Sequence, residues 1–461
     1  MTAQHLAADE PFYRQWSRRG TMPRTLTSSR RLLNLLGFTA PPSLAVVGSK
    51  GKGTAAAAAT MALVDSGLTT VSVTSPAFRT NRERIRINGT ALTLEAYELV
   101  SEKLAGLLPL LPADHYLSPT GAYTIMGAWY ASHIGADVLV LEEGMGGSTD
   151  EVSLFDHTAL AVTPIFLEHA GILGNTEGEI AENLLGAGSA SVRLIASAPQ
   201  SPEITSLVEN RATEWGATLV PTSPAHHRNP LVGESMGLGR AMGSVFAKLL
   251  LSEPRHSCSE PNRPLTVPDS FPSQPSRNSL DETSGAAPPA DSGAQRTSFS
   301  SDTGVQASAA DSGSSTRHST SLPGNSVNLP VDSLNFPHDP VTAPDRSLNL
   351  PGRSSIHETA SGTWFVDAAI APAAVEAALR ASAMSKPVVI ASWPLSKDHE
   401  GCFEIVPDAI LVRSGVGLAF PPGLPSLADV APGLSGDMIA LGTISFIAEV
   451  LDYLGASTES W

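Results

Sequence analysis

The stretch LAVVGSKGKGTAAAAAT, residues 44–60, decides the fold class of this chain. A short apolar strand at 43–48 runs into a glycine-rich turn, and an alanine-rich helix follows at 55–66, where Gly67 ends it. Glycines at such a turn let backbone N–H groups approach phosphate oxygens, and the helix N-terminus adds a partial positive charge. The order of strand, loop and helix therefore predicts a phosphate-binding loop in an α/β fold.

The spacing inside this loop departs from the strict G-x-x-x-x-G-K-[ST] pattern. Only two residues separate Gly48 from Gly51, and Gly53 stands between Lys52 and Thr54. At a nucleotide site, Lys52 would reach the β- and γ-phosphates, and Thr54 would offer its hydroxyl to magnesium or to a phosphate. A glycine turn without a ligand fits the bare pattern too, so the loop by itself leaves both interpretations open.

Other short β-rich runs alternate with helical segments along the chain. Before residue 250 the strand-like runs lie at 70–74, 137–141, 159–163 and 193–196. After residue 350 the strand-like runs lie at 363–366, 388–391 and 409–412, and helix-like runs lie at 373–381 and 438–454. Continuous apolar strands between helices predict a parallel sheet covered on both faces, followed by a second, smaller α/β domain.

Composition divides the chain into three parts. Residues 253-330 are rich in Ser, Pro, Asp, Asn and Gly, so they cannot bury enough surface to offset the entropy of ordering. We expect a disordered insertion there, which serves either as a flexible linker or as a binding or phosphorylation segment. The insertion separates an N-terminal domain at 1-252 from a C-terminal domain at 331-461.

The bulk composition argues against several classes of protein. The net charge of -16 is the wrong sign for a general binder of nucleic acid or of anionic membranes. Two cysteines, Cys258 and Cys402, build neither a disulfide framework nor a zinc site. The chain lacks the roughly 18 consecutive apolar residues of a membrane span, and its start, MTAQHLAADEPFYRQWSRRG, lacks the apolar run of a signal peptide. We expect a cytoplasmic monomer without nucleic-acid or membrane partners.

Further motifs follow the phosphate loop in a fixed order. They are TSPAFRTNRERIRING (74–89), VLVLEEGMGGSTD (138–150), VTPIFLEHAGILGNTEGEIA (162–181), LPGR (350–353), FVDAAIAP (365–372) and SKDHEG (396–401). Together with the loop they resemble the motif set of the folylpolyglutamate and dihydrofolate synthases, relatives of the Mur ligases. That family carries G-T-N-G-K-G-[ST] in the loop and V-L-E-V-G-L-G-G-R-x-D where this chain has VLVLEEGMGGSTD.

The resemblance implies a fold and a reaction. The fold would be a Mur-ligase-like, phosphate-loop ATP-binding domain with a parallel sheet, plus a smaller C-terminal Rossmann-like α/β domain. The enzyme would be an ATP-dependent acid–amino-acid ligase that adds L-glutamate to a folate or dihydropteroate carboxylate through an acyl phosphate. Its ligands would be ATP, Mg2+, L-glutamate and the folate or dihydropteroate.

The resemblance also assigns nucleotide contacts. They comprise the loop, which consists of Gly48, Ser49, Lys50, Gly51, Lys52, Gly53 and Thr54. The C-terminal domain would add Arg353 and Asp367. An arginine can clamp a phosphate with two hydrogen bonds, and an aspartate can accept hydrogen bonds from ribose hydroxyls. Without the resemblance, Arg353 is equally well explained as a solvated charge.

The magnesium positions of the family fall on Ser75, Glu142 and His169. The catalytic candidates are Lys52, Glu142 and His169. Taken without the resemblance, Glu142 could be a solvated acid at a strand end, His169 a loop histidine and Ser75 a turn residue.

Some family positions are replaced in this chain. The family's carbamylated lysine falls on Leu184, and its His-Asn pair falls on Ile370 and Ala371. Other replaced positions are Ala77, Ser148, Glu168 and Arg240. Besides a divergent synthase, the sequence therefore allows a paralogue that binds nucleotide or folate without ligation, or a Mur-type ligase for another carboxylate.

Overall fold

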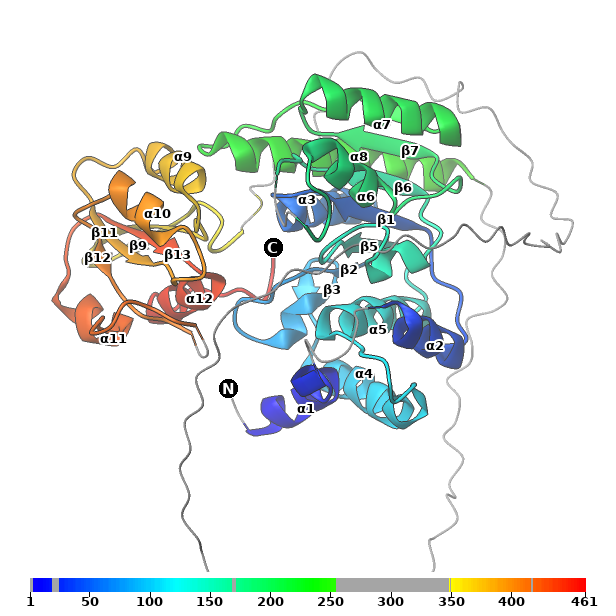
Figure 1. The fold of residues 1–461 in the computed structure, drawn as a ribbon, viewed down its shortest axis with the longest axis horizontal. Helices are drawn as coiled ribbons and strands as arrows, with labels where there is room; N and C mark the ends of the chain where they lie inside the picture. The colour runs from blue at the N-terminus through cyan, green and yellow to red at the C-terminus, as the bar shows by residue number, and fades with distance from the viewer. Residues whose placement is uncertain (1–2, 19–24, 168–170, 254–347, 349, 416–417) are drawn as a thin grey trace, which may run out of the picture. The chain divides into compact units, whose positions relative to one another are not determined.

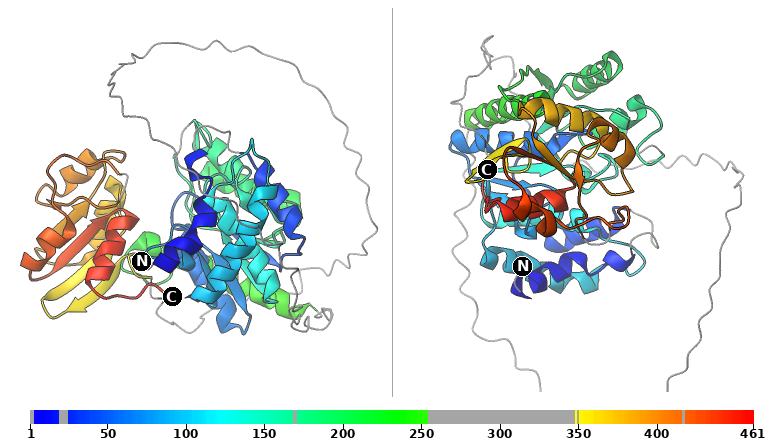
Figure 2. Two further views of the ribbon diagram at one scale, coloured as in Figure 1. Left: turned by 90° about the horizontal axis from the view of Figure 1, so that it is seen from below. Right: turned by 90° about the vertical axis from the view of Figure 1, so that its left-hand side faces the viewer.

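The computed structural model describes residues 3–18, 25–167, 171–253, 348, 350–415 and 418–461. Within them, two sheets carry helices on both faces (Figures 1 and 2). The insertion expected at 253-330 lies outside the described residues, apart from Glu253. The boundaries at 1-252 and 331-461 stay predictions.

The first sheet has eight strands in the described part of the chain, in the order β4-β3-β2-β5-β1-β6-β7-β8. The strands are β1 (Ser43–Val47), β2 (Thr70–Val73), β3 (Ile85–Ile87), β4 (Thr90–Ala91), β5 (Val138–Glu142), β6 (Ala159–Val162), β7 (Leu194–Ser197) and β8 (Thr218–Val220). β1 lies between β5 and β6 and runs parallel to both. The expected parallel sheet is confirmed for the strands β2-β5-β1-β6-β7-β8, in their order across the sheet. β3 and β4 add an antiparallel edge beside β2.

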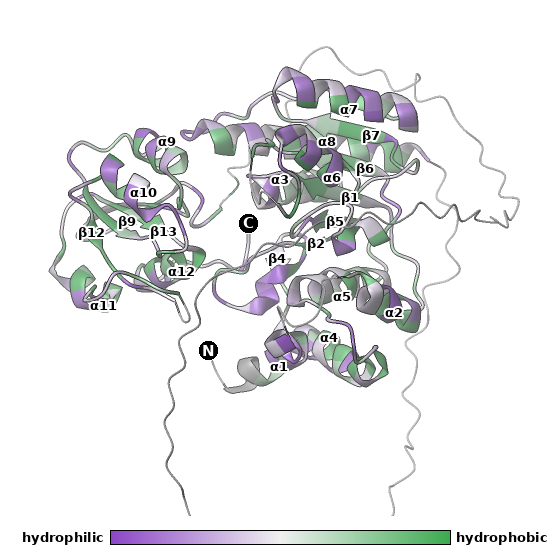
Figure 3. Cartoon of the chain, in the orientation of Figure 1, coloured by the Kyte–Doolittle hydropathy of each residue, from purple (hydrophilic) through white to green (hydrophobic). Residues whose placement is uncertain are grey.

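Helices cover both faces of this sheet. They are α1 (Ala3–Tyr13), α2 (Thr27–Leu36), α3 (Lys52–Asp65), α4 (Leu94–Leu107), α5 (Pro119–His133), α6 (Glu177–Leu185), α7 (Pro202–Trp215) and α8 (Pro230–Ser252). Short 3₁₀ turns lie at Trp16–Arg18 (η1), Asn81–Arg84 (η2), Leu108–Leu110 (η3) and Glu151–Leu154 (η4). α3 and α8 pack on one face, whereas α5 covers the other and has α2, α4 and α1 packed behind it. Both faces are therefore covered at the central strands, which explains why β1, β5 and β6 are buried along their whole length and mostly apolar (Figure 3).

The alanine-rich sequence of α3 reflects close packing against α8. A Cβ added at Gly239 of α8 would lie 2.2 Å from the carbonyl oxygen of Ala55, and one at Gly243 would lie 2.5 Å from that of Ala59. Small residues on both helices therefore let the two backbones approach. This contact holds the helix whose first turn forms part of the phosphate loop.

The second sheet has five strands in the described part of the chain, in the order β12-β11-β13-β10-β9. The elements are β9 (Ser355–Thr359), β10 (Gly362–Asp367), α9 (Pro372–Ser382), β11 (Val388–Ser392), α10 (His399–Ile405), β12 (Ile410–Leu411), α11 (Leu427–Val430), η6 (Ala431–Gly433), β13 (Met438–Gly442) and α12 (Ile444–Tyr453). One core contains residues of α11 and α12, and another contains residues of α9 and α10. The second α/β unit is thus confirmed, with only β9 antiparallel.

One element prediction was wrong in part. The run at 438–454 was expected to be a single helix, but it forms β13 and then α12. Gly442, with a φ of 158°, ends the strand, and the Thr443 side chain caps the helix by accepting from the N–H of Phe446 at 3.3 Å. A continuous apolar run does not by itself distinguish a buried strand from a buried helix.

Residues 458–461 return to the β3–β4 edge of the first sheet. The N–H of Ala91 donates to the carbonyl of Glu459 at 2.8 Å, and the guanidinium of Arg86 donates to the carbonyl of Thr458 at 2.7 Å. The same guanidinium lies over the ring of Trp461, 4.7 Å from its centroid. Among the described residues, no helix is long and apolar enough to cross a membrane.

Candidate nucleotide site

The phosphate loop connects β1 to α3 through two glycines that no other residue could replace without strain. Gly48 has a φ of 131° and Gly51 a φ of 87°. A Cβ at Gly48 would lie 2.2 Å from the hydroxyl oxygen of Thr163, and one at Gly51 would lie 2.0 Å from that of Ser235. The first N–H groups of α3, beginning at Lys52, have no acceptor four residues earlier in the helix. Together with the helix dipole they make a place for an anion.

Lys52 points back along this loop. Its ammonium donates to the carbonyl of Gly48 at 2.5 Å and lies 3.4 Å from Oε2 of Glu143. The Lys52 side chain is 15% exposed, so it remains accessible to a ligand in the loop.

Glu142 ends β5, and Ser75 follows β2, the strand next to β5. Parallel neighbours end at the same edge of a sheet, which is where α/β proteins bind ligands. The N–H of Ser75 accordingly donates to Oε2 of Glu142 at 2.8 Å. Burial raises the pKa of Glu142, while the charge of Arg353 and this hydrogen bond oppose the shift. The structure thus brings two of the predicted magnesium positions together.

Glu143 is a buried acid at the loop that the sequence analysis missed. Its side chain is 1% exposed, and its Oε2 has no hydrogen-bond donor. Burial raises its pKa to about 7, the charge of Lys52 lowers it, and that of Asp150 raises it. The signal was present in the sequence, because VLVLEEG has an acid where the family pattern V-L-E-V-G has valine.

The two predicted contacts from the C-terminal part of the chain take different places. The guanidinium of Arg353 donates to the Thr54 hydroxyl at 3.2 Å, so it reaches the phosphate loop. Asp367, at the end of β10, accepts instead from the Ser354 hydroxyl at 2.6 Å, which in turn accepts from the Asn229 amide at 3.0 Å. Burial raises the pKa of Asp367.

A pocket of about 300 Å³ collects most of these groups. Its lining includes Ser49, Lys50, Gly51, Lys52, Gly53, Ser75, Glu142, Glu143 and Arg353. The pocket therefore combines three cationic residues, Lys50, Lys52 and Arg353, with hydroxyl and carboxylate oxygens at the N-terminus of a helix.

The oxygen atoms that line this pocket are suitable ligands for a magnesium ion. Magnesium keeps several waters and needs only one or two carboxylates beside the phosphates of its nucleotide. Ser75 and Glu142 supply a hydroxyl and a carboxylate, and the buried Oε2 of Glu143 has no donor of its own. The third predicted position, His169, lies outside the described residues, as does Glu168. In the described residues, no three His, Cys, Asp or Glu side chains form a metal cluster by themselves.

The replaced family positions at Leu184, Ile370 and Ala371 are all within the described residues. Leu184 is 1% exposed and belongs to the apolar core of the first sheet, so it cannot ligate a metal. Ile370 and Ala371 lie between β10 and α9.

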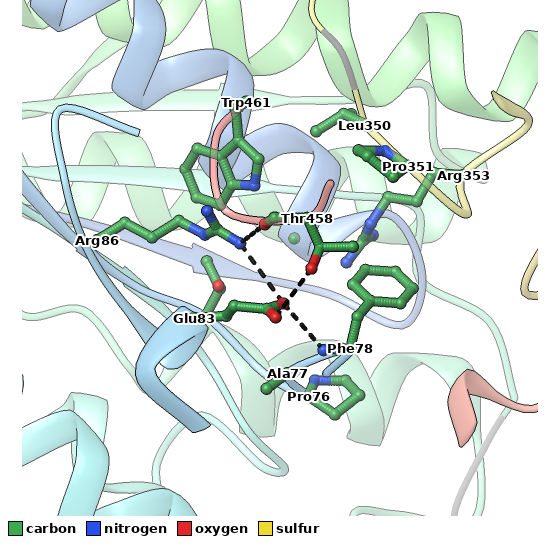
Figure 4. A pocket seen from close by; sticks show the side chains of 12 residues that line it. Pro76, Ala77, Phe78, Glu83, Arg86, Leu350, Pro351, Arg353, Thr458 and Trp461 are labelled. Atoms are coloured by element: carbon green, nitrogen blue, oxygen red, sulfur yellow. Dashed lines mark hydrogen bonds and ion pairs between the residues drawn. The ribbon is translucent and has the colours of Figure 1, made fainter. Parts of the chain in front are cut away.

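The loop that carries Ser75 is fixed by Glu83. Its carboxylate accepts from the backbone N–H groups of Phe78, Arg79 and Thr80 at 3.1–3.2 Å, and from the Thr458 hydroxyl at 2.9 Å. Figure 4 shows this carboxylate in a second pocket that Arg353 also lines.

Comparison with known proteins gives these features a context. No family model matches the chain. It is 36% identical over 171 residues to a probable bifunctional folylpolyglutamate synthase/dihydropteroate synthase of Haloferax volcanii, covering 36% of this chain and 20% of the relative. It is 33% identical over 166 residues to the folylpolyglutamate synthase of Lacticaseibacillus casei, covering 34% of this chain and 39% of that relative. Over these stretches the chain is similar to folylpolyglutamate synthases.

The matched stretches span a fifth to two fifths of the length of these curated relatives. Solved folylpolyglutamate synthases agree with the fold over nearly their whole length. A Thermotoga maritima structure has a TM-score of 0.66 at 14% identity and covers 99% of both chains. A Mycobacterium tuberculosis structure complexed with ADP and AMPPCP has a TM-score of 0.64 at 15% identity and covers 98% of this chain and 99% of that one. The expected fold class is confirmed.

Proposed function

We propose that this chain belongs to the folylpolyglutamate synthase family and is an ATP-dependent ligase that adds L-glutamate to a folate or dihydropteroate carboxylate through an acyl phosphate. One observation carries the proposal. The phosphate loop, the carboxylate of Glu142 and the guanidinium of Arg353 line one pocket, with Lys52 directed along the loop.

In this proposal the chain's own groups hold the triphosphate. The N–H groups at the start of α3 and the charges of Lys52 and Arg353 would neutralise the phosphoryl group during transfer. Positioning the acceptor carboxylate, and then the glutamate amine, against that phosphoryl group would supply most of the remaining rate enhancement. Ser75, Glu142 and His169 would hold magnesium, which when bound stabilises charge on the phosphates. A cytoplasmic, monomeric state belongs to the same proposal and rests on the sequence.

An ADP-release assay tests the proposal. Purified protein with ATP, magnesium, L-glutamate and either dihydropteroate or a reduced folate should release ADP and form the amide. Lys52→Ala should abolish both. If the wild-type protein binds ATP but releases no ADP with any of these acceptors, the proposal is wrong.

A second candidate function follows from Leu184. Because its side chain lies in the core, the chain lacks one metal-supporting group of the family and could bind nucleotide without turning it over. The same assay separates the two functions, since ligation at ordinary enzyme rates excludes the non-catalytic one. A screen of other carboxylates for ADP release addresses a Mur-type ligase with a different acceptor.

A further inference from the structure

Glu143 follows Glu142 in the chain and is a second acid in the pocket of the phosphate loop. Its N–H continues the pairing with β1 by donating to the carbonyl of Val46 at 3.0 Å, which fixes the backbone at the sheet edge. Both carboxylates line the pocket of the phosphate loop, and both are buried, with residue exposures of 6% for Glu142 and 1% for Glu143.

The surroundings of Glu143 satisfy only part of its carboxylate: burial raises its pKa, Lys52 and the backbone of Gly146 lower it, and Oε2 accepts no hydrogen bond. Its Oε2 lies 3.4 Å from the Lys52 ammonium, beyond a good hydrogen bond, and accepts from no donor. The same ammonium already donates to the carbonyl of Gly48 at 2.5 Å. A buried carboxylate oxygen without a donor is unfavourable unless a cation completes its surroundings.

Lys52 is the cation nearest to Glu143 in the pocket of the phosphate loop. The residues lining this pocket include the acids Glu142 and Glu143 and the cations Lys50, Lys52 and Arg353. When Lys52 turns to the phosphates of a nucleotide, Glu143 loses its nearest cation. A divalent ion that arrives with the nucleotide would replace that charge.

We propose that Glu143 is a second carboxylate ligand of the magnesium ion that accompanies ATP, beside Glu142. The inference rests on the proposed nucleotide site and deepens it. Magnesium at nucleotide sites takes one or two carboxylates, so the pair is a suitable number. Glu143 also supplies a carboxylate in a chain where Leu184 removes the one that the family's carbamylated lysine would give. The loop after Glu143 packs on this part of α6, because a Cβ at Gly147 would lie 2.2 Å from the Leu184 carbonyl oxygen.

The competing role for Glu143 is to position Lys52 without touching the metal. The two roles differ in their dependence on magnesium. A ligand of the metal matters only when the metal is present, whereas a residue that orients Lys52 affects ATP binding with or without it.

The experiment measures ATP affinity by calorimetry in EDTA and in excess MgCl2 for the wild-type chain, Glu143→Gln and Glu143→Val. Glutamine keeps the shape of the side chain, and valine is the residue of the family pattern, so one variant remains informative if the other does not fold. Glu182→Gln is the control, because Glu182 is half-exposed and pairs with Arg211 away from the pocket. Melting curves establish that each variant is folded.

In EDTA, we expect the ATP affinity of the Glu143 variants to lie within about twofold of the wild-type value. The increase in ATP affinity on adding MgCl2 should be smaller in the variants by about tenfold or more, as when groups that support a metal are removed. Mn2+ titrated into the ATP complex and followed by electron paramagnetic resonance should show a matching loss of Mn2+ affinity. An equal loss in EDTA and in MgCl2 would overturn the proposal and leave Glu143 a positioning residue for Lys52. If the wild-type chain binds ATP and the Glu143 variants keep the same magnesium dependence, the proposal is overturned and the proposed function still stands. A wild-type chain that binds no ATP would overturn both.

Discussion

At the scale of single residues, the two lysines of the phosphate loop provide a direct test of which cation holds the phosphates. Lys52 is largely buried and lies along the loop, whereas Lys50 is exposed. Lys52→Ala should weaken ATP binding by about a hundredfold, since a charge-assisted hydrogen bond contributes about 1.5–3 kcal/mol. Calorimetric titration with ATP measures the effect. Lys50→Ala should weaken binding much less, and equal losses would contradict the role given to Lys52.

His157 gives the fold a dependence on pH that is separate from the site. The ring is buried, its Nε2–H donates to the carbonyl of Val152 at 2.8 Å, and its Nδ1 accepts from the Ser43 hydroxyl at 2.8 Å, so it is neutral. Burial lowers the pKa of His157 to about 4 from an ordinary value of about 6.5. The unfolded chain therefore binds a proton that the folded chain does not, and stability is lost as the pH falls from about 6.5 to about 4, by about 3 kcal/mol at most.

Urea unfolding of the wild-type chain and of His157→Gln at pH 7, 5.5 and 4.5 measures this loss. The variant should be less stable at pH 7 and should lose less on acidification. Parallel losses in the two proteins would show that His157 does not carry the dependence.

The residue scale also shows what the sequence could and could not predict at the site. The loop, Ser75 and Glu142 were found because their motifs are contiguous and lie at strand ends. Glu143 was not predicted because the family motif has its acid at the position of Glu142, and the burial of the next residue is visible only in the structure. The indirect position of Asp367, which bonds Ser354, depends on side-chain packing that no motif encodes.

At the scale of elements, the contact between α3 and α8 supports the phosphate loop. Gly239→Ala would place a methyl group 2.2 Å from the Ala55 carbonyl oxygen, and backbone cannot give way as a flexible side chain can. We expect a loss of about 1–3 kcal/mol in the free energy of unfolding, as for other overpacked interiors. Gly106→Ala in α4 is the matched control, since an added Cβ there meets nothing within 4 Å and should stabilise by about 0.5–1 kcal/mol. Denaturant unfolding of both variants checks the pair, and a neutral Gly239→Ala would contradict the packing.

Alternating strands and helices were predictable because each element repeats one physical pattern. A strand covered on both faces is apolar throughout, so β1, β2, β5, β6 and β7 lie within a residue or two of their expected positions. The prediction of a single helix at 438–454 was wrong for the same reason. β13 and α12 are both apolar, and only Thr443 lies between them. The antiparallel edge of β3 and β4 depends on pairing across the sheet, which local sequence does not specify.

At the scale of the whole molecule, the similarity to folylpolyglutamate synthases consists of local sequence matches and a shared fold. The solved relatives keep the fold at 14–18% identity, so most side chains have changed while the arrangement of strands has not. The features of this chain that resemble the family's motifs include the strand, loop and helix at the phosphate loop and the acid at the end of β5. These are the parts that phosphate chemistry constrains. The similarity to folylpolyglutamate synthases is therefore detectable although the position of that family's lysine is Leu184 in this chain.

The stability of the whole chain should depend on ATP. Lys52 on α3 and Arg353 before β9 line the same pocket, so a nucleotide would bind only when these distant segments are folded together. A ligand that binds only the folded state should raise the free energy of unfolding by about 2.7 kcal/mol at a hundred times its dissociation constant, and by about 1.4 kcal/mol for each further tenfold increase. Urea unfolding at several concentrations of Mg2+–ATP measures this slope. Lys52→Ala should move the rise to higher ATP concentrations without changing the slope.

A stability that does not change with ATP would mean that the pocket is not a nucleotide site. A normal slope without ADP release would place the chain with the non-catalytic binders, because binding needs the loop and the two cations, while ligation also needs the groups that position the acceptor.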